Sequence, residues 1–291
     1  MAYISSRRSR WPVAVLCRAL GVSESGYYKH LRFKNKPDKH ANLLAQIYEL
    51  IQEDAENANY GVRRIYDYLR LYRKYCGSLR TIYRICKENN LMIHMKRKPN
   101  GITKADAAAQ KSENLIKQDF TAKAPNQKWL TDITEIPCKE GKLYLAPILD
   151  CYDGTIRGFK MDDNMRADLC VDAFQKACRD DHAKGMILHS DRGTQFTSKS
   201  FRNALKKANA VQSMSGTGRC YDNARMESFF ATLKKEKLYK IDTKNMLMAE
   251  VKTIVYRYIH YYNRRRIYST NGGYPPLTYR ELFYVNQQQA A

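Results

Sequence analysis

Three acidic residues in the middle of the chain combine a residue type and a spacing that could do chemistry. Asp132 lies in "WLTDITEIP", Asp191 ends "GMILHSD", and Glu227 follows in "CYDNARMESFF". All three stand next to apolar segments, where a carboxylate is unfavourable unless it is paired or bound to a cation. Because no His or Cys stands at ligand spacing with them, the set favours a hard cation, Mg²⁺ or Mn²⁺, over zinc.

Each acid also has a structural explanation that involves no chemistry. Asp132 could pair with a core arginine, Asp191 could cap the following turn, and Glu227 could be a surface acid on a helix. One such coincidence is ordinary. Three acids that converge on one edge of a sheet favour a shared site.

The elements expected around these acids form a mixed α/β domain. Short β-rich runs begin at Gln127, and a helix (166–181), a strand (185–190), a helix (198–209) and a strand (211–215) follow. This order predicts one central sheet. We expect Asp132 inside the first strand and Asp191 at the carboxyl end of a later one, where ligands of such sheets gather.

The third acid is expected on an amphipathic helix. Asp222 or Asn223 can cap this helix, and its buried stripe includes Met226, Phe229, Phe230 and Leu233. On a helical wheel Asn223, Glu227 and Lys234 fall together at the edge of the stripe. Glu227 is therefore predicted to face the sheet.

Two helix-turn-helix outlines precede the α/β region. Residues 11–31 show a helix, a glycine turn and a second helix capped by Ser23, and residues 60–92 repeat the outline with Ser78 as the cap. In the second copy Arg80, Arg84 and Lys87 recur at i, i+4 and i+7. Such a basic row suits a recognition helix in the major groove of DNA, although a solvated charged face is the alternative.

The overall charge also points to a polyanionic partner. The 51 Lys and Arg residues exceed the 29 Asp and Glu residues, which gives a net charge of +22 over 291 residues. Nucleic acid is the commonest partner of so basic a chain. Eight cysteines without a Cys-x-x-Cys pair, no signal peptide and no apolar run long enough to cross a membrane predict a protein of the reducing cytoplasm.

With "WLTDIT", "HSDRGTQFTS" and "CYDNARMESFFATLKKE", the chain resembles DDE transposases with a retroviral-integrase-type core. More narrowly it is similar to the downstream-frame (OrfB) protein of IS-three-type bacterial insertion sequences. The likeness covers residues from about 40 to the end, including "YNRRRIYSTNGGYPPLTYRE". Tyr268 stands where that family more often has His, Asn271 replaces the usual Leu, and residues 216–218 depart from the more usual Arg-Lys-Gly.

The resemblance implies an RNase-H-like core in which Asp132, Asp191 and Glu227 hold two divalent ions. It implies cleavage at the ends of the insertion sequence by water, then attack by the freed 3′-hydroxyl on target DNA, without a histidine base. Lys234 is a candidate phosphate contact or a solvated lysine. His189 and Asn223 are candidates to orient the acids without binding the ions themselves. Packing is the alternative role for His189.

The domain organisation follows from these assignments. Five segments are expected: a helix-turn-helix-like segment (1–35), a helical DNA-binding domain (40–95), a basic linker (96–124), the catalytic core (125–242) and a C-terminal helical extension (243–291). In the last segment a helix at 245–266 is expected to brace the core and to bury Leu247. It ends in Arg264, Arg265 and Arg266, which are predicted to meet the DNA backbone.

The predicted partners are the terminal inverted repeats of the element, target DNA, further copies of the chain on DNA, and an upstream-frame OrfA protein, joined or separate. The expected location is the bacterial cytoplasm, in association with the nucleoid. Two other functions stay open. One is a catalytically silent DNA-binding regulator descended from a transposase, and the other is an RNase-H-like nuclease.

Overall fold

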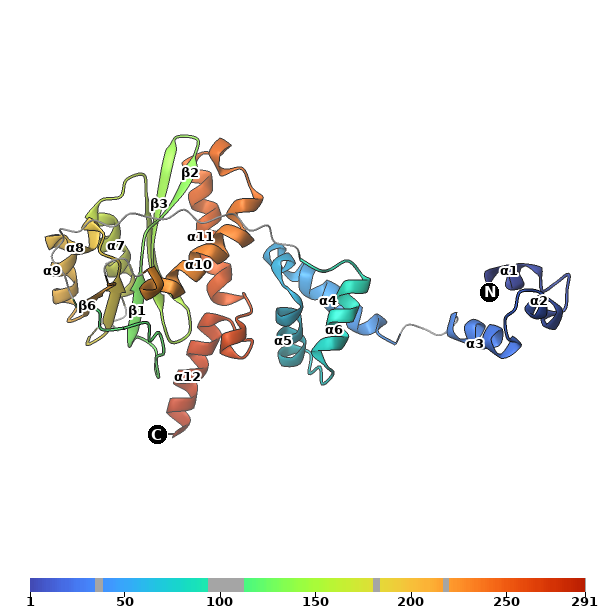
Figure 1. Cartoon of the computed structure of the whole chain (residues 1–291). Helices are drawn as coiled ribbons and strands as arrows, with labels where there is room; N and C mark the ends of the chain where they lie inside the picture. The colour runs from blue at the N-terminus through green and yellow to red at the C-terminus, as the bar shows by residue number, and fades with distance from the viewer. Residues whose placement is uncertain (35–38, 94–112, 180–183, 217–219, 291) are drawn as a thin grey trace. The chain divides into compact units, whose positions relative to one another are not determined.

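The computed structural model of the chain describes residues 1–34, 39–93, 113–179, 184–216 and 220–290 (Figure 1). Two compact units are present, Met1–Glu49 and Leu50–Ala291. The helix α4 (Ala41–Glu53) runs across the boundary between them. Each unit is described by itself.

The first unit is a small helical module. Its helices are α1 (Ala2–Arg7), α2 (Val13–Ala19) and α3 (Glu24–Lys34). Gly21 has a φ of +63°, a left-handed conformation that suits glycine and turns the chain between α2 and α3. The Ser23 hydroxyl accepts the Gly26 N–H at 3.1 Å and so caps α3 as predicted. Ile4, Cys17 and Tyr27 form the core.

The second unit begins with another helical pair. It comprises the 3₁₀ helix η1 (Ala55–Asn59), α5 (Val62–Tyr72) and α6 (Leu79–Glu88). The Ser78 hydroxyl accepts the Thr81 N–H at 3.3 Å, which confirms the predicted cap of α6. Ile82 and Ile85 are buried where α6 packs against α5. Tyr72, the last residue of α5, is exposed.

A six-stranded mixed sheet forms the centre of the second unit. Its strands are β1 (Lys128–Thr131), β2 (Thr134–Cys138), β3 (Gly141–Asp150), β4 (Ile156–Asp162), β5 (Ile187–Ser190) and β6 (Val211–Met214). The order is β2–β3–β1–β5–β6, and β4 pairs with β3. Strands β1, β5 and β6 are parallel to one another, and β3 is antiparallel to β1, β2 and β4.

The predicted first strand is split in two, and the split falls at Asp132. Thr131 pairs with Ile148 and Thr134 with Leu145, so both halves keep one register on β3, with paired numbers that sum to 279. Continued through the gap, this register sets Asp132 opposite Pro147. Proline has no N–H to give to a ladder. The prediction that Asp132 lies within a strand was therefore wrong by one residue, and its backbone is released from the sheet.

Helices cover both faces of the sheet (Figure 1). On one side lie α7 (Ala167–Ala177), the short α8 (Thr194–Thr197) and α9 (Lys199–Lys207), and on the other lie α10 (Ala224–Glu236) and α11 (Met248–Arg264). Trp129 and Leu188 belong to the apolar core under α7 and α9. Because side chains alternate along a strand, even-numbered residues of β1 and odd-numbered residues of β5 face the α10 side.

The C-terminal region fastens onto this core. It contains η2 (Cys220–Asn223), η3 (Leu238–Lys240), η4 (Thr243–Asn245), η5 (Ser269–Asn271) and α12 (Pro276–Ala290). The buried Arg280 of α12 pairs with Asp150 and Asp153, the latter at 2.7 Å. Leu247 was expected inside a helix, but it precedes α11 and is exposed.

Candidate active site

Asp132 and Asp191 lie beyond the ends of two adjacent parallel strands. In the pairing of β1 with β5 the residue numbers differ by 59 (Leu130 with His189), and 191 − 132 gives the same difference. Both acids therefore stand one residue past the strand ends. Neighbouring strands are about 4.8 Å apart, so the two carboxylates share one small region.

Local hydrogen bonds orient the two carboxylates. The Ile133 N–H donates to Asp132 Oδ1 at 2.8 Å, and the Gly193 N–H donates to Asp191 Oδ1 at 3.0 Å. A Cβ atom at Gly193 would lie 3.1 Å from Asp191 Oδ1 and 2.9 Å from the Gln195 side chain. Glycine at this position therefore leaves room for the Asp191 carboxylate.

Glu227 approaches from α10, in the first turn of the helix. The start of this helix is tied to the sheet because the buried Asn223 donates a hydrogen bond to the Thr131 carbonyl at 3.2 Å. The predicted cap was wrong for both candidates in the described structure. Asn223 reaches β1 instead, and the Asp222 carboxylate accepts the side-chain amide of Asn114 at 2.8 Å.

The charges of Asp191 and Glu227 both act on Asp132. The pKa of Asp132 is raised to about 7, first by burial and then by the negative charges of Asp191 and Glu227, whereas the Ile133 N–H and Lys234 oppose the rise. Burial also raises the pKa of Asp191. Asp191 is exposed as a residue, so water screens part of its charge, whereas Asp132 is half-buried.

The donor set fits a hard divalent cation. After burial, the charges of Asp191 and Glu227 also raise the pKa of Asp132, and a bound cation would offset that repulsion. As they stand, no three His, Cys, Asp or Glu side chains among the described residues are gathered tightly enough to hold an ion.

Comparison with known proteins identifies the family. The family model described as "Integrase core domain" matches residues 122–220, and a second family model with the same description matches residues 209–276. InsK of insertion sequence element IS150 from Escherichia coli K12 is 33% identical over 98% of this chain and 99% of that protein. The chain belongs to the IS3 family of DDE transposases. Transposase InsF of insertion sequence IS3A, from the same strain, is 32% identical over 94% of this chain and 96% of that protein.

The transposase is thus a polynucleotidyl transferase of DNA transposition, and its mixed sheet lies within the matched integrase core. The HTLV-2 integrase catalytic core, solved with magnesium, is 17% identical, with a TM-score of 0.43 over 54% of this chain and 98% of that one. Family membership rests on the sequence relatives. No helix in the described parts of the transposase could span a membrane.

Lys234 acts electrostatically on the same site. It lies on α10 about two turns after Glu227 and is half-buried. Burial lowers the pKa of Lys234, whereas the charges of Glu135 and Asp132 raise it. A phosphate contact of Lys234 remains a prediction, but the lysine stands close enough to the acids to act on their charge.

His189 is part of the sheet packing. Its ring is fully buried, with Nδ1 2.8 Å from the Ser213 hydroxyl and Nε2 3.2 Å from the Ser215 hydroxyl. Burial lowers the pKa of His189 to about 4, although Asp222 acts in the opposite direction. The imidazole is therefore neutral at pH 7, and both its nitrogens are occupied by hydroxyl groups rather than by the carboxylates.

The basic residues predicted to meet DNA divide into two groups. Arg80, Arg84 and Lys87 are all exposed on α6, and their contact with DNA remains a prediction. The prediction for Arg266 was wrong, because the residue is 4% exposed and its guanidinium donates to both carboxylate oxygens of Glu236, at 2.8 and 2.9 Å. An arginine so enclosed cannot reach a DNA backbone.

The other two arginines of this run stay at the surface. Arg264 is exposed, and Arg265 is exposed with an ion pair to Asp54 at 3.1 Å. Their contact with DNA remains a prediction.

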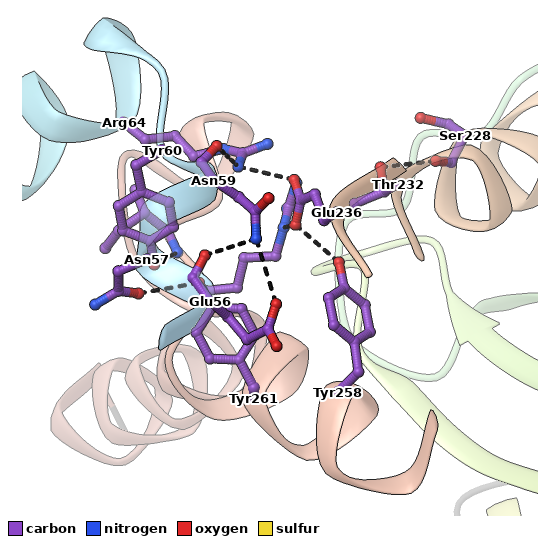
Figure 2. A network of polar contacts seen from close by, with 12 residues as sticks. Glu56, Asn57, Asn59, Tyr60, Arg64, Ser228, Thr232, Glu236, Tyr258 and Tyr261 are labelled. Atoms are coloured by element: carbon purple, nitrogen blue, oxygen red, sulfur yellow. Dashed lines mark hydrogen bonds and ion pairs between the residues drawn. The ribbon is translucent and has the colours of Figure 1, made fainter. Parts of the chain in front are cut away.

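Glu236 is the residue that sequence reasoning missed. It ends α10, is buried, and accepts hydrogen bonds from Arg64 and Tyr258 as well as Arg266 (Figure 2). One signal was present in the sequence. Phe229, Leu233 and Glu236 follow at i, i+4 and i+7, so the acid continues the buried stripe of the helix and requires a buried cation.

Proposed function

We propose that this transposase cuts DNA at the ends of its insertion sequence and joins the freed 3′ ends to target DNA, with Asp132, Asp191 and Glu227 holding two divalent ions, Mg²⁺ or Mn²⁺. The observation that supports this assignment is that Asp132 and Asp191 directly follow the paired parallel strands β1 and β5, and that the charges of Asp191 and Glu227 act on Asp132. When bound, two such ions stabilise the attacking and leaving oxygens of an in-line displacement at phosphorus.

Two displacements make up the proposed reaction. Water attacks a phosphodiester at the end of the element, a new P–O bond forms, and the bond to the 3′ oxygen breaks and leaves a 3′-hydroxyl. That hydroxyl then attacks a phosphodiester of target DNA, forms one bond and displaces one 3′ oxygen. Since each step exchanges one P–O bond for another, strand joining needs no further energy source.

The residues of the chain have separate tasks in this scheme. The three carboxylates hold the charge that attracts the cations, and Asp132 must lose its proton to take part. Lys234 would bind a phosphate oxygen close to the reacting bond, as its position beside Asp132 allows. His189 does not serve as a base, because its ring is bonded to two serine hydroxyls.

We also propose the finer partners and the location predicted from the sequence. The net charge of +22 supports binding to the terminal inverted repeats and to target DNA. Several copies of the chain would act together on DNA, with an upstream-frame OrfA protein, in the cytoplasm at the nucleoid. Sedimentation of the protein mixed with DNA that carries the element ends, with and without the OrfA protein, measures the size of the complex and so tests these partners.

The reaction is tested with a supercoiled plasmid that carries both ends of the insertion sequence. The plasmid is incubated with Mg²⁺ and the transposase, with or without the upstream protein, and the wild type is compared with Asp191→Asn. We expect nicking at the ends and strand joining by the wild type alone, with equal DNA binding by both proteins.

The remaining outcomes decide between the other functions. Binding at the ends without cleavage, in Mg²⁺ and in Mn²⁺, would favour a silent regulator. Cleavage without joining, at positions unrelated to the ends, would favour a nuclease. Equal turnover by Asp191→Asn would refute the assignment of the acids.

A further inference from the structure

The segment formed by η1 and α5 is docked against the end of α10, α11 and the chain that follows. We call this contact the docking interface; it joins residues 54–72 to residues 236–273. Its polar contacts include Arg64 to Glu236 at 2.9 Å, Tyr261 to Asn57 at 3.0 Å, Ser269 to Asp67 at 2.7 Å, and Lys237 to Glu56.

The interface is buried as well as polar. Asn57 is 5% exposed, Asp67 2% and Glu236 3%, and each has a hydrogen-bond partner across the interface. A shifted arrangement would leave several buried polar groups without hydrogen bonds, which is strongly unfavourable. Buried polar pairs of this kind therefore favour a single docked arrangement.

Glu236 links the interface to the candidate active site. Figure 2 shows its carboxylate between Arg64 of α5 and Tyr258 of α11. Glu236 is the last residue of α10, and Glu227 lies in the first turn of the same helix. Nine residues at 1.5 Å each separate them, so the docked carboxylate and the candidate catalytic carboxylate are about 13–14 Å apart along one rigid element.

The other side of the helical pair stays open. The docking interface uses η1 and α5, whereas the exposed basic row of Arg80, Arg84 and Lys87 lies on α6. Buried Ile65 and Leu69 of α5 and Ile82 and Ile85 of α6 hold the two helices together. The helix predicted to meet DNA is thus joined through packed elements to the helix that carries Glu227.

We propose that the docking interface sets the distance along DNA between the sequence that α6 contacts and the phosphodiester that is cut. This inference rests on the proposed function, since it takes α6 as a DNA-contacting helix and Asp132, Asp191 and Glu227 as the cutting site. Arg64, Tyr261 and Ser269 are positioning residues in this scheme. They touch neither the acids nor the basic row, yet they determine which bond is cut.

The test loosens the interface and maps the cuts. The variant Arg64→Met/Tyr261→Phe/Ser269→Ala removes three of its hydrogen bonds, while Glu236 keeps Arg266 and Tyr258 as partners. Full-length protein is incubated with Mg²⁺ and an end-labelled duplex that carries one end of the insertion sequence, and each 3′ end is mapped to the nucleotide. The matched control, Lys160→Met/Tyr68→Phe/Ser200→Ala, makes the same kinds of deletion in bonds that do not cross the interface.

We expect the wild type and the control to cut at one dominant position. The loosened variant should bind the duplex with unchanged affinity and spread its cuts over neighbouring bonds, so that the fraction at the dominant position falls about threefold or more, since a misplacement of about 1 Å already changes reaction rates strongly. One unchanged position in the loosened variant, with binding and cutting retained, would overturn the proposal. No cutting by the wild type would instead refute the proposed function. If the triple variant does not fold, the single variant Arg64→Met is mapped instead. Cuts spread over neighbouring bonds would then support the proposal, and one unchanged position would overturn it.

A second measurement asks whether the interface persists on DNA. A carbodiimide joins the carboxylate of Glu56 directly to the amine of Lys237 when the two form an ion pair, as they do here. We expect the cross-linked peptide from both free and DNA-bound protein. Its loss on binding to the duplex would show that the segment undocks before the chemistry and would overturn the proposal.

Discussion

The side-chain amide of Asn223 donates a hydrogen bond to the carbonyl oxygen of Thr131, which joins the residue before α10 to the last residue of β1. Asp132 follows Thr131 directly, and Glu227 stands one helical turn after Asn223. One hydrogen bond thus sets the distance between two carboxylates that belong to different elements, so Asn223 is a positioning residue.

Replacement of Asn223 should impair the site without unfolding the protein. We expect Asn223→Ala to lower strand cleavage about 10–100-fold, the usual cost of losing a residue that orients a metal ligand. The rise in melting temperature that Mg²⁺ produces should shrink in parallel. Asn245→Ala, which removes an exposed asparagine that donates to Asp242, is the control. A normal response to Mg²⁺ in Asn223→Ala would contradict this role.

The raised pKa of Asp132 predicts a pH-dependent stability of the metal-free protein. The folded protein holds the Asp132 proton up to about pH 7, whereas the unfolded chain releases it near pH 4. Between these values the folded state binds more protons, so this group stabilises the fold below pH 4 and its contribution is lost as the pH rises to 7. In EDTA at pH 8, Asp132→Asn should therefore be more stable than the wild type by about 1–3 kcal/mol.

Thermal unfolding at pH 4 and pH 8 checks this expectation. At pH 4 the variant and the wild type should melt at nearly the same temperature. Saturating Mg²⁺ at pH 8 should raise the melting temperature of the wild type and not that of the variant. A variant that is less stable than the wild type in EDTA at pH 8 would contradict the electrostatic account.

The buried pair of Arg266 and Glu236 predicts a large loss of stability when it is broken. Arg266→Ala leaves a buried carboxylate with fewer partners and should lower the free energy of unfolding by about 3–5 kcal/mol. Arg264→Ala, at the exposed start of the same run, should change it by less than about 0.5 kcal/mol. Urea unfolding of the two variants separates the structural arginine from the surface one, and equal midpoints would refute the distinction.

The exposed row on α6 predicts a salt-dependent contribution to DNA binding. The affinity for DNA falls as the salt concentration rises, and the slope of log affinity against log salt concentration reports the number of phosphates neutralised. Replacing Arg80, Arg84 or Lys87 by Ala should make this slope less steep by about 1 for each DNA phosphate that the side chain neutralises in the wild type. Lys176→Ala, an exposed lysine on α7, is the control and should leave the slope unchanged. Slopes equal to the wild type in all three variants would show that α6 does not face DNA.

Features that depend on neighbouring residues in the sequence were predicted well. Ser23 and Ser78 cap the helices for which they were chosen, because an N-cap depends only on residues a few positions away. The position of Asp191 at the end of a short apolar strand could also be predicted, because the apolar residues and Asp191 are adjacent in the sequence. These features need no knowledge of the tertiary fold.

Features that depend on distant residues could not be read in the same way. The break at Asp132 depends on Pro147 in a neighbouring strand, and its effect appears only when the register of β3 is known. Arg266 stands in a run of three arginines that resembles a surface patch. Its burial follows from Glu236, 30 residues earlier, which the sequence offered only as an acid on an apolar stripe.

The ion pairs that Arg280 of α12 makes with the core have a consequence for chains whose translation ends early. Arg280 supplies the positive charge between two buried carboxylates, Asp150 and Asp153, that the ribosome makes well over a hundred residues earlier. A chain that stops short of residue 280 would bury both acids without their cation and would fail to hold its sheet. We therefore expect a product of premature termination to unfold at a lower temperature than the full chain, so that only a completed transposase has a stable catalytic sheet.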